Sequence, residues 1–178
     1  RIRQAGLEVR PHAKAHKSPA IALRQIASGA HGICCQQLSE AQVFAAAGVQ
    51  DILVTNQVVG LLKTRRAACL SKSTRLAVCA DHPLPVTQLA AAARAADTVI
   101  GVLVEVDIGH GRCGVTSPEE ALAVANAVRD STPHLEFRGI HAFRGSAQHM
   151  RDPDSRANAV TAAVSLLRQH VALLEQSG

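Results

Sequence analysis

The sequence predicts an α/β fold built around a parallel β-sheet, and two observations support this prediction. Short apolar runs alternate with amphipathic stretches six times along the 178 residues, and the connections are short, with no linker between domains. The run at 51–55 is almost continuously apolar, as in strands that are buried on both faces. An open doubly wound sheet and a closed barrel account for this alternation equally well.

Residues that start or stop helices bound the expected elements. Residues 1–6 read as the tail of a helix closed by Gly6, and 7–14 as the first strand. Ser18 is the expected N-cap of a helix over 18–28, with Pro19 at its first position. The other expected strands are 32–35, 51–55, 74–79, 98–107 and 135–142. The other expected helices are 39–47, one that follows Gln57 and ends at about Leu70, 83–96, one opened by Ser117, and 154–175.

Composition limits the classes of function. The chain is rich in Ala, has no Trp or Tyr and only three Phe, so its core must consist of Ala, Val, Leu and Ile. The net charge of +5 comes from scattered basic residues with few aromatics among them, which argues against nucleic-acid binding. An anionic cofactor or substrate, or a solvated surface, explains the charge. No apolar run is long enough to span a membrane.

Five cysteines form no CxxC pair. We expect reduced core or near-site thiols in a cytoplasmic protein, with Cys34 and Cys35 on opposite faces of a strand.

The segment from Arg10 to Ser18 places two lysines and two histidines where a strand ends and a helix begins. In α/β proteins, active sites are built at such strand ends. Most lysines are solvated, and we interpret Lys17 in that way. Lys14 lies in phase with the expected strand, between His12 and His16, and an amine in such a setting could attack a carbonyl to form a Schiff base.

Two further motifs follow later strands. The segment Glu105–Gly114 contains Gly109, Gly111 and Gly114, whose spacing does not fit a dinucleotide-binding fingerprint, and a turn with a solvated Arg112 is an equally good interpretation. His141 and His149 end the sixth strand. They could be metal ligands, bases or solvated loop residues, and either one taken alone is more often structural.

The run Arg10-Pro-His-Ala-Lys-Ala-His-Lys17 resembles the cofactor-binding segment of the D-threonine and D-3-hydroxyaspartate aldolases, relatives of the D-serine dehydratases. This resemblance implies a pyridoxal phosphate (PLP)-binding TIM barrel of the alanine-racemase type. The chain would then hold about six of eight strand–helix units as a fragment of a longer protein. Lys14 would carry PLP, Arg112 would hydrogen-bond its ring hydroxyl, and His149 would take the proton of the substrate's β-hydroxyl.

Two positions depart from the family pattern, which usually has Tyr at Phe143 and Gln at His141. Both side chains are expected beside the cofactor. Gln57, at the end of the third strand, is a further expected contact of the site.

The resemblance implies a PLP- and divalent-metal-dependent aldolase that cleaves β-hydroxy-D-amino acids of the D-threonine or D-3-hydroxyaspartate type. The metal (Mn, Mg or Zn) would be held by a C-terminal domain outside residues 1–178, so no metal ligand is expected within the chain. We expect the chain alone to be inactive and the full-length protein to be a homodimer. The alternatives are a D-serine dehydratase, a non-catalytic PLP-binding barrel, and a structural fragment that binds no PLP.

Overall fold

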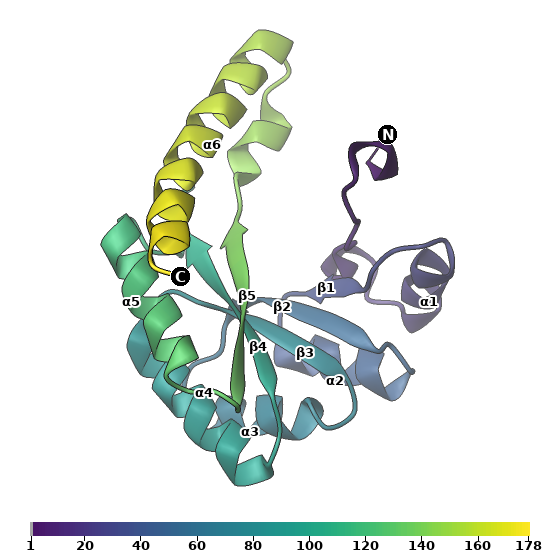
Figure 1. Ribbon diagram of the computed structural model, residues 1–178. Coiled ribbons are helices and arrows are strands. Elements are labelled where there is room, and N and C mark those ends of the chain that lie inside the picture. The colour runs from purple at the N-terminus through teal and green to yellow at the C-terminus, as the bar shows by residue number, and fades with distance from the viewer. Residues whose placement is uncertain (1) are drawn as a thin grey trace.

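Five parallel strands form the sheet of the computed structural model, which describes residues 2–178 (Figure 1). The strands are β1 (Ile33–Cys35), β2 (Asp51–Gln57), β3 (Arg75–Ala80), β4 (Ile100–Val106) and β5 (Leu135–Ala142). Their spatial order is β1-β2-β3-β4-β5, the order of the chain itself. A doubly wound sheet reverses its strand order at a switch point, whereas the described strands wind in one direction, as in a barrel.

Helices alternate with these strands, and α3, α4 and α5 follow one another along the same side of the sheet (Figure 1). The α-helices are α1 (Pro19–Ala27), α2 (Leu38–Ala46), α3 (Leu61–Leu70), α4 (Pro83–Ala96), α5 (Pro118–Arg129) and α6 (Pro153–Gln176). Three 3-10 turns are η1 (Arg3–Ala5), η2 (Ala13–Ala15) and η3 (Gly145–His149). The predicted helix starts at Ser18 and Ser117 are confirmed, because each side chain accepts a hydrogen bond from the backbone three residues on.

Two apolar clusters occupy the two faces of the sheet. The larger one packs the strands against the helices, and the smaller one comprises Cys34, Leu53, Ala77, Cys79 and Leu103. Cys35 belongs to the larger cluster and Cys34 to the smaller, which confirms that these neighbours point to opposite faces. All five cysteines are free, but Cys69 is exposed on α3 rather than placed in a core or near a site.

The strand expected at 7–14 is wrong. This segment is extended and joins the sheet through two backbone bonds, from His31 N–H to the Val9 oxygen (3.0 Å) and from Cys34 N–H to the Pro11 oxygen (2.8 Å). Its pairing ends in an isolated bridge between His12 and Cys34. Pro11 has no N–H to extend the ladder, and η2 starts directly after His12. Lys14 therefore lies in a 3-10 turn, and the sheet has five strands instead of six.

The start of the chain also differs from the prediction. The helix tail expected over 1–6 is the single 3-10 turn η1, followed by Gly6 in a left-handed conformation (φ 71°). Arg1 lies outside the described residues.

A charged network ties the extended segment to the N-terminal ends of the strands. The buried carboxylate of Asp51, at the start of β2, contacts the guanidinium of Arg10 and lies 2.8 Å from Arg75 Nε. His31 Nε2 lies 3.7 Å from the same carboxylate. Arg75 is also the residue of β3 that pairs in register with Asp51. This network lies at the opposite end of the strands from Lys14.

We predict that Asp51→Asn destabilises the fold. The substitution removes the negative charge that two guanidinium groups share, and hydrogen bonds to charged groups typically contribute about 1.5–3 kcal/mol, so we expect a loss of about 2 kcal/mol. Urea denaturation of the purified protein measures it. The control is Asp97→Asn, at an exposed left-handed position (φ 50°) after α4, where Asn is readily accommodated. Equal urea midpoints for the two variants would contradict the proposed role of Asp51.

Candidate active site

The candidate site lies at the C-terminal ends of the strands, on the face that carries the smaller apolar cluster. Side chains alternate along a strand, so Thr55 follows Leu53 on this face and Glu105 follows Leu103. His141 of β5 is the register partner of Glu105. Polar groups thus replace the apolar cluster where the strands end.

A small hollow of about 40 Å³ collects most of the predicted site residues at this edge. It is lined by His12, Lys14, Gln36, Thr55, Arg112, His141 and Phe143. Four of these, Lys14, Arg112, His141 and Phe143, were predicted to form the site from the sequence. Lys14, Arg112 and Phe143 are exposed, so the hollow faces solvent.

A hydrogen-bond relay defines the protonation state of His12 beside Lys14. His12 Nδ1 accepts from the Lys14 backbone N–H (3.3 Å), so this nitrogen carries no proton. The Thr55 hydroxyl donates to the Cys35 carbonyl (3.2 Å), which leaves its oxygen to accept from His12 Nε2 at 3.0 Å. Burial, and then the charge of Lys14, lower the pKa of His12. The relay and the pKa both favour a neutral imidazole.

The buried carboxylate of Glu105 organises the other side of the hollow. Only 2% of Glu105 is exposed, and its Oε2 accepts from Gln57 Nε2 at 2.6 Å. Its Oε1 lies 3.7 Å from His141 Nδ1 and 3.6 Å from Arg112 Nη2. Burial raises the pKa of Glu105, but His141, Gln57 and Arg112 together outweigh burial and hold that pKa below its usual value.

Arg112 is carried by a glycine-rich loop that Asp107 shapes. The Asp107 carboxylate accepts from the backbone N–H groups of Gly109 (2.9 Å), His110 (2.7 Å) and Gly111 (3.1 Å). Although burial raises the pKa of Asp107, these bonds outweigh it and lower that pKa. Gly114 closes the loop at φ 109°, and a Cβ there would lie 2.5 Å from the Asp107 nitrogen, so only glycine fits.

Phe143 is held between two neighbours. The Arg112 guanidinium lies 5.3 Å from its ring centre, and the His110 ring meets it edge-on at 5.2 Å. A Cβ on Gly145 would come within 2.7 Å of the Phe143 ring. Phe143 therefore gives the hollow a fixed aromatic surface without a hydroxyl donor.

Two predicted residues lie away from this hollow. Gln57 supports the hollow through Glu105 but lines a neighbouring one. His149 is exposed on η3, where its Nε2 lies 3.4 Å from Gln148 Nε2, and it does not line the hollow at Lys14. The roles assigned to all of the predicted residues stay predictions.

Glu105, Thr55 and Gln36 were not predicted as parts of the site, and His12 was predicted only as a neighbour of Lys14. One signal was available for Glu105. It is the single charged residue in the apolar run Ile100–Val106, and a buried charge requires partners.

Three potential metal ligands also meet beside the hollow, although none was expected in this chain. Ligand atoms of Cys79, Glu105 and His141 lie within 4.8 Å of one another. Burial raises the pKa of the Cys79 thiol, which keeps it protonated. One oxygen of Glu105 already accepts a hydrogen bond from Gln57. These three side chains are therefore better explained as structural support for the hollow than as a metal centre.

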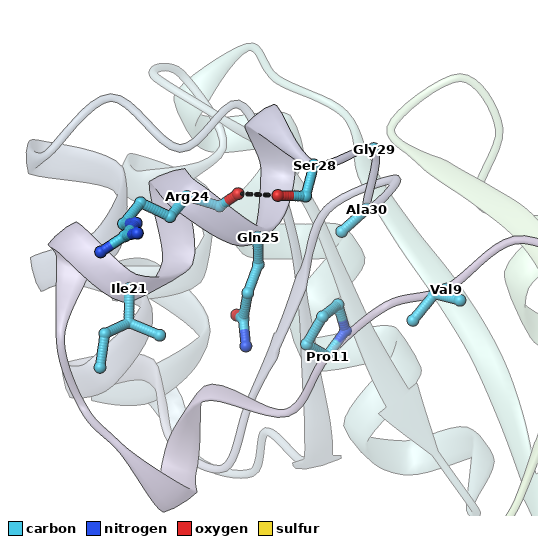
Figure 2. A pocket seen from close by; sticks show the side chains of 8 residues that line it. All are labelled: Val9, Pro11, Ile21, Arg24, Gln25, Ser28, Gly29 and Ala30. Atoms are coloured by element: carbon cyan, nitrogen blue, oxygen red, sulfur yellow. Dashed lines mark hydrogen bonds between the residues drawn. The ribbon is translucent and has the colours of Figure 1, made fainter.

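A larger hollow, of about 460 Å³, lies elsewhere in the fold (Figure 2). It lies between α1 and the extended segment, and the side chain of Gln25 points toward Pro11 (Figure 2). Most of its surface is apolar, and Arg24 is its only charged lining residue. Its other polar lining side chains are Gln25 and Ser28, and the Ser28 hydroxyl donates to the Arg24 carbonyl at 2.9 Å.

We predict that Glu105→Gln lowers stability at pH 7 by about 1.5–3 kcal/mol, the usual contribution of hydrogen bonds to charged groups. The folded-state pKa of Glu105 is depressed, so its contribution is present above the unfolded value of about 4.3 and is lost as the pH falls through the folded value. Denaturation of both proteins between pH 7 and 3 should show the gap closing below about pH 4.3.

Glu136→Gln is the control for this experiment, because Glu136 pairs with Arg138 at the surface and should contribute less than about 0.5 kcal/mol. A gap between Glu105→Gln and the parent protein that stays constant down to pH 3 would contradict the ionised, partnered state of Glu105.

Comparison with known proteins assigns the chain to a family. Residues 1–178 match the family described as alanine racemase, N-terminal domain. The chain is 46% identical over 170 residues to a D-threonine aldolase from Arthrobacter sp, covering 96% of this chain and 45% of that protein. It is 39% identical over 175 residues to a 3-hydroxy-D-aspartate aldolase from Paracoccus denitrificans (strain Pd 1222), covering 97% and 45%.

The crystal structure of D-threonine aldolase from Filomicrobium marinum has a TM-score of 0.96 and 41% sequence identity, covering 99% of this chain and 48% of that one. The chain thus spans about half the length of the relatives it matches. These matches confirm the predicted fold class, part of a barrel of the alanine-racemase type. The chain belongs to the alanine racemase N-terminal domain family.

Proposed function

We propose that this chain forms the cofactor-holding part of a PLP-dependent lyase that cleaves β-hydroxy-D-amino acids of the D-threonine or D-3-hydroxyaspartate type to glycine and an aldehyde. The family is PLP-dependent. The observation that carries the proposal is the meeting of a primary amine, a guanidinium and an imidazole, from Lys14, Arg112 and His141, around one hollow. The 46% identity to a protein named D-threonine aldolase supports this choice of reaction.

The side chains around the hollow fit PLP chemically. The exposed amine of Lys14 is free to meet an aldehyde carbon, and a primary amine is the group that binds PLP covalently. Arg112 lies 3.6 Å from Glu105, beyond a close hydrogen bond, so its donors can serve an anionic ring oxygen. When bound, PLP supplies an electron sink for the negative charge left at Cα as the Cα–Cβ bond breaks.

The chain's own residues set the charge and position of these groups. His12 stays neutral beside Lys14 and so adds no competing positive charge. The charge of Glu105 attracts Arg112 and His141 at 3.6 and 3.7 Å to the same side of the hollow. We assign the proton of the β-hydroxyl to His149, as the family resemblance implies, and an exposed imidazole suits that transfer near neutral pH.

Other parts of the proposed enzyme would be formed by residues outside 1–178. A C-terminal domain outside residues 1–178 would hold a divalent cation (Mn, Mg or Zn), which supplies Lewis acidity toward the β-hydroxyl. We propose a homodimer as the full-length form and the cytoplasm as its location. Within residues 2–178, none of the helices combines the length and apolar character needed to cross a bilayer.

We predict that borohydride reduction of the full-length protein with PLP attaches the cofactor to the peptide that contains Lys14. Mass spectrometry of the digest locates the label. Lys14→Ala should abolish it, whereas Lys17→Ala should leave it, because Lys17 is 68% exposed and pairs with Glu40 at 3.2 Å. Persistence of the label in Lys14→Ala, or its absence from the parent protein, would refute the role of Lys14.

We predict that the full-length protein with PLP and Mn²⁺ converts D-threonine or 3-hydroxy-D-aspartate to glycine and the matching aldehyde. Amino-acid analysis measures glycine, and a coupled dehydrogenase measures the aldehyde. Pyruvate from D-serine without glycine from either substrate would show a dehydratase instead. Labelling of Lys14 without any product would show a non-catalytic PLP-binding protein.

A further inference from the structure

We propose that Arg144 is a positioning residue, which fixes the loop that carries Arg112 to the turn that carries His149, so that these two groups keep one relative position. This inference rests on the proposed function, which assigns a role to each of the two groups. Arg144 directly follows Phe143 in the chain but does not line the Lys14 hollow itself. It would therefore act through its neighbours and not on the substrate.

The two segments leave the sheet side by side. The last register pair of β4 and β5 joins Val106 to Ala142. The loop 107–114 follows β4, and η3 begins two residues beyond the end of β5. A bridge between Val106 and Val115 closes the base of the loop. Its tip, residues 108–112, lies beyond that bridge and needs contacts of its own to hold one position.

One residue holds both segments by hydrogen bonds. Arg144 Nη1 donates to the Ile108 carbonyl at 3.3 Å. Within residues 2–178, this is the single hydrogen bond between the backbone of the tip and a residue outside the loop. The backbone oxygen of Arg144 accepts from the Ala147 N–H at 3.2 Å, at the start of η3. The side chain thus holds the tip, and the main chain holds the turn with His149.

Gly109 gives the guanidinium of Arg144 the space it needs. The backbone at Gly109 has φ 90°, and a Cβ there would overlap Nη1 of Arg144. Gly111 also has a positive φ, of 71°, but a Cβ there would meet no atom within 4 Å. Both positions favour glycine for their conformation, whereas only Gly109 also needs the missing Cβ for a close approach.

Ring contacts join the same two segments on the side of the hollow. The His110 ring of the tip meets the Phe143 ring edge-on at 5.2 Å. A Cβ on Gly145, the first residue of η3, would lie 3.1 Å from His110 Cε1. Ring contacts of this kind tolerate sliding, whereas a hydrogen bond has a preferred direction. The bond from Arg144 to Ile108 therefore adds the orientation that the rings do not set.

Stability alone is a poor explanation for an arginine at this position. The Nε of Arg144 is enclosed and has no hydrogen-bond partner among residues 2–178. No carboxylate of the described chain forms an ion pair with its guanidinium either. A buried donor without an acceptor costs free energy. The position that Arg144 gives to the two segments explains the residue better.

Hydrogen exchange of the full-length protein without PLP, read by mass spectrometry, tests the connection directly. Arg144→Gln should speed exchange roughly fivefold in 108–112 and in 145–149 together, the factor that corresponds to one lost hydrogen bond. Gly109→Ala should also speed exchange in 145–149, because its Cβ displaces Arg144. Gly111→Ala is the matched control, with a similar backbone strain but no contact with Arg144, and should leave 145–149 unchanged.

Kinetics of the full-length protein with PLP and Mn²⁺ provide the second test. We expect Arg144→Gln to lower kcat for D-threonine about 10- to 100-fold, because a displacement of about 1 Å in the reacting groups can cost about 10²-fold. KM should change less than about twofold, because Arg144 does not bind the substrate. Arg151→Gln, which removes an exposed arginine just beyond η3, should leave kcat unchanged.

Three results would overturn the proposal. They are faster exchange in Arg144→Gln that is confined to 108–112, equal responses of 145–149 to Gly109→Ala and Gly111→Ala, and a kcat of Arg144→Gln equal to that of the parent. Faster exchange throughout the chain with a lower urea midpoint would show a general structural role and would also overturn it. If the parent cleaves no substrate, the proposed reaction fails, and hydrogen exchange alone decides whether Arg144 joins the two segments.

Discussion

The ionised carboxylate of Glu105 is the constraint on which the site depends. Removing a carboxylate from water costs several kcal/mol unless nearby donors and charges compensate, and Glu105 is 2% exposed. Its partners come from β2, from the loop after β4 and from β5. Loss of any one of the three leaves the buried charge less well compensated. The relative positions of Gln57, Arg112 and His141 are therefore coupled, although the residues lie far apart in the sequence.

The position of Lys14 depends on a second, independent device. The 3-10 turn that carries it begins at His12, whose imidazole is held by Thr55 on one nitrogen and by the Lys14 backbone on the other. A protonated His12 would lose the bond to Lys14, because Nδ1 would become a donor. The lowered pKa of His12 thus preserves the turn as well as limiting positive charge beside the amine. Positive groups still exceed negative ones around the hollow, which favours anionic ligands.

Helix caps and apolar patterns in the sequence predicted the elements whose bounds are set by neighbouring residues. The helix Pro83–Ala96 and the strand Leu135–Ala142 have the predicted bounds, and the caps at Ser18 and Ser117 form. The strand predicted at 7–14 does not form, because a strand needs continuous pairing with a neighbour and Pro11 interrupts that pairing. The hydrogen bond between Gln57 and Glu105 could not be predicted from the sequence, since it joins residues 48 positions apart. The residues predicted at strand ends converged, but spacing could not tell that His149 is exposed on η3.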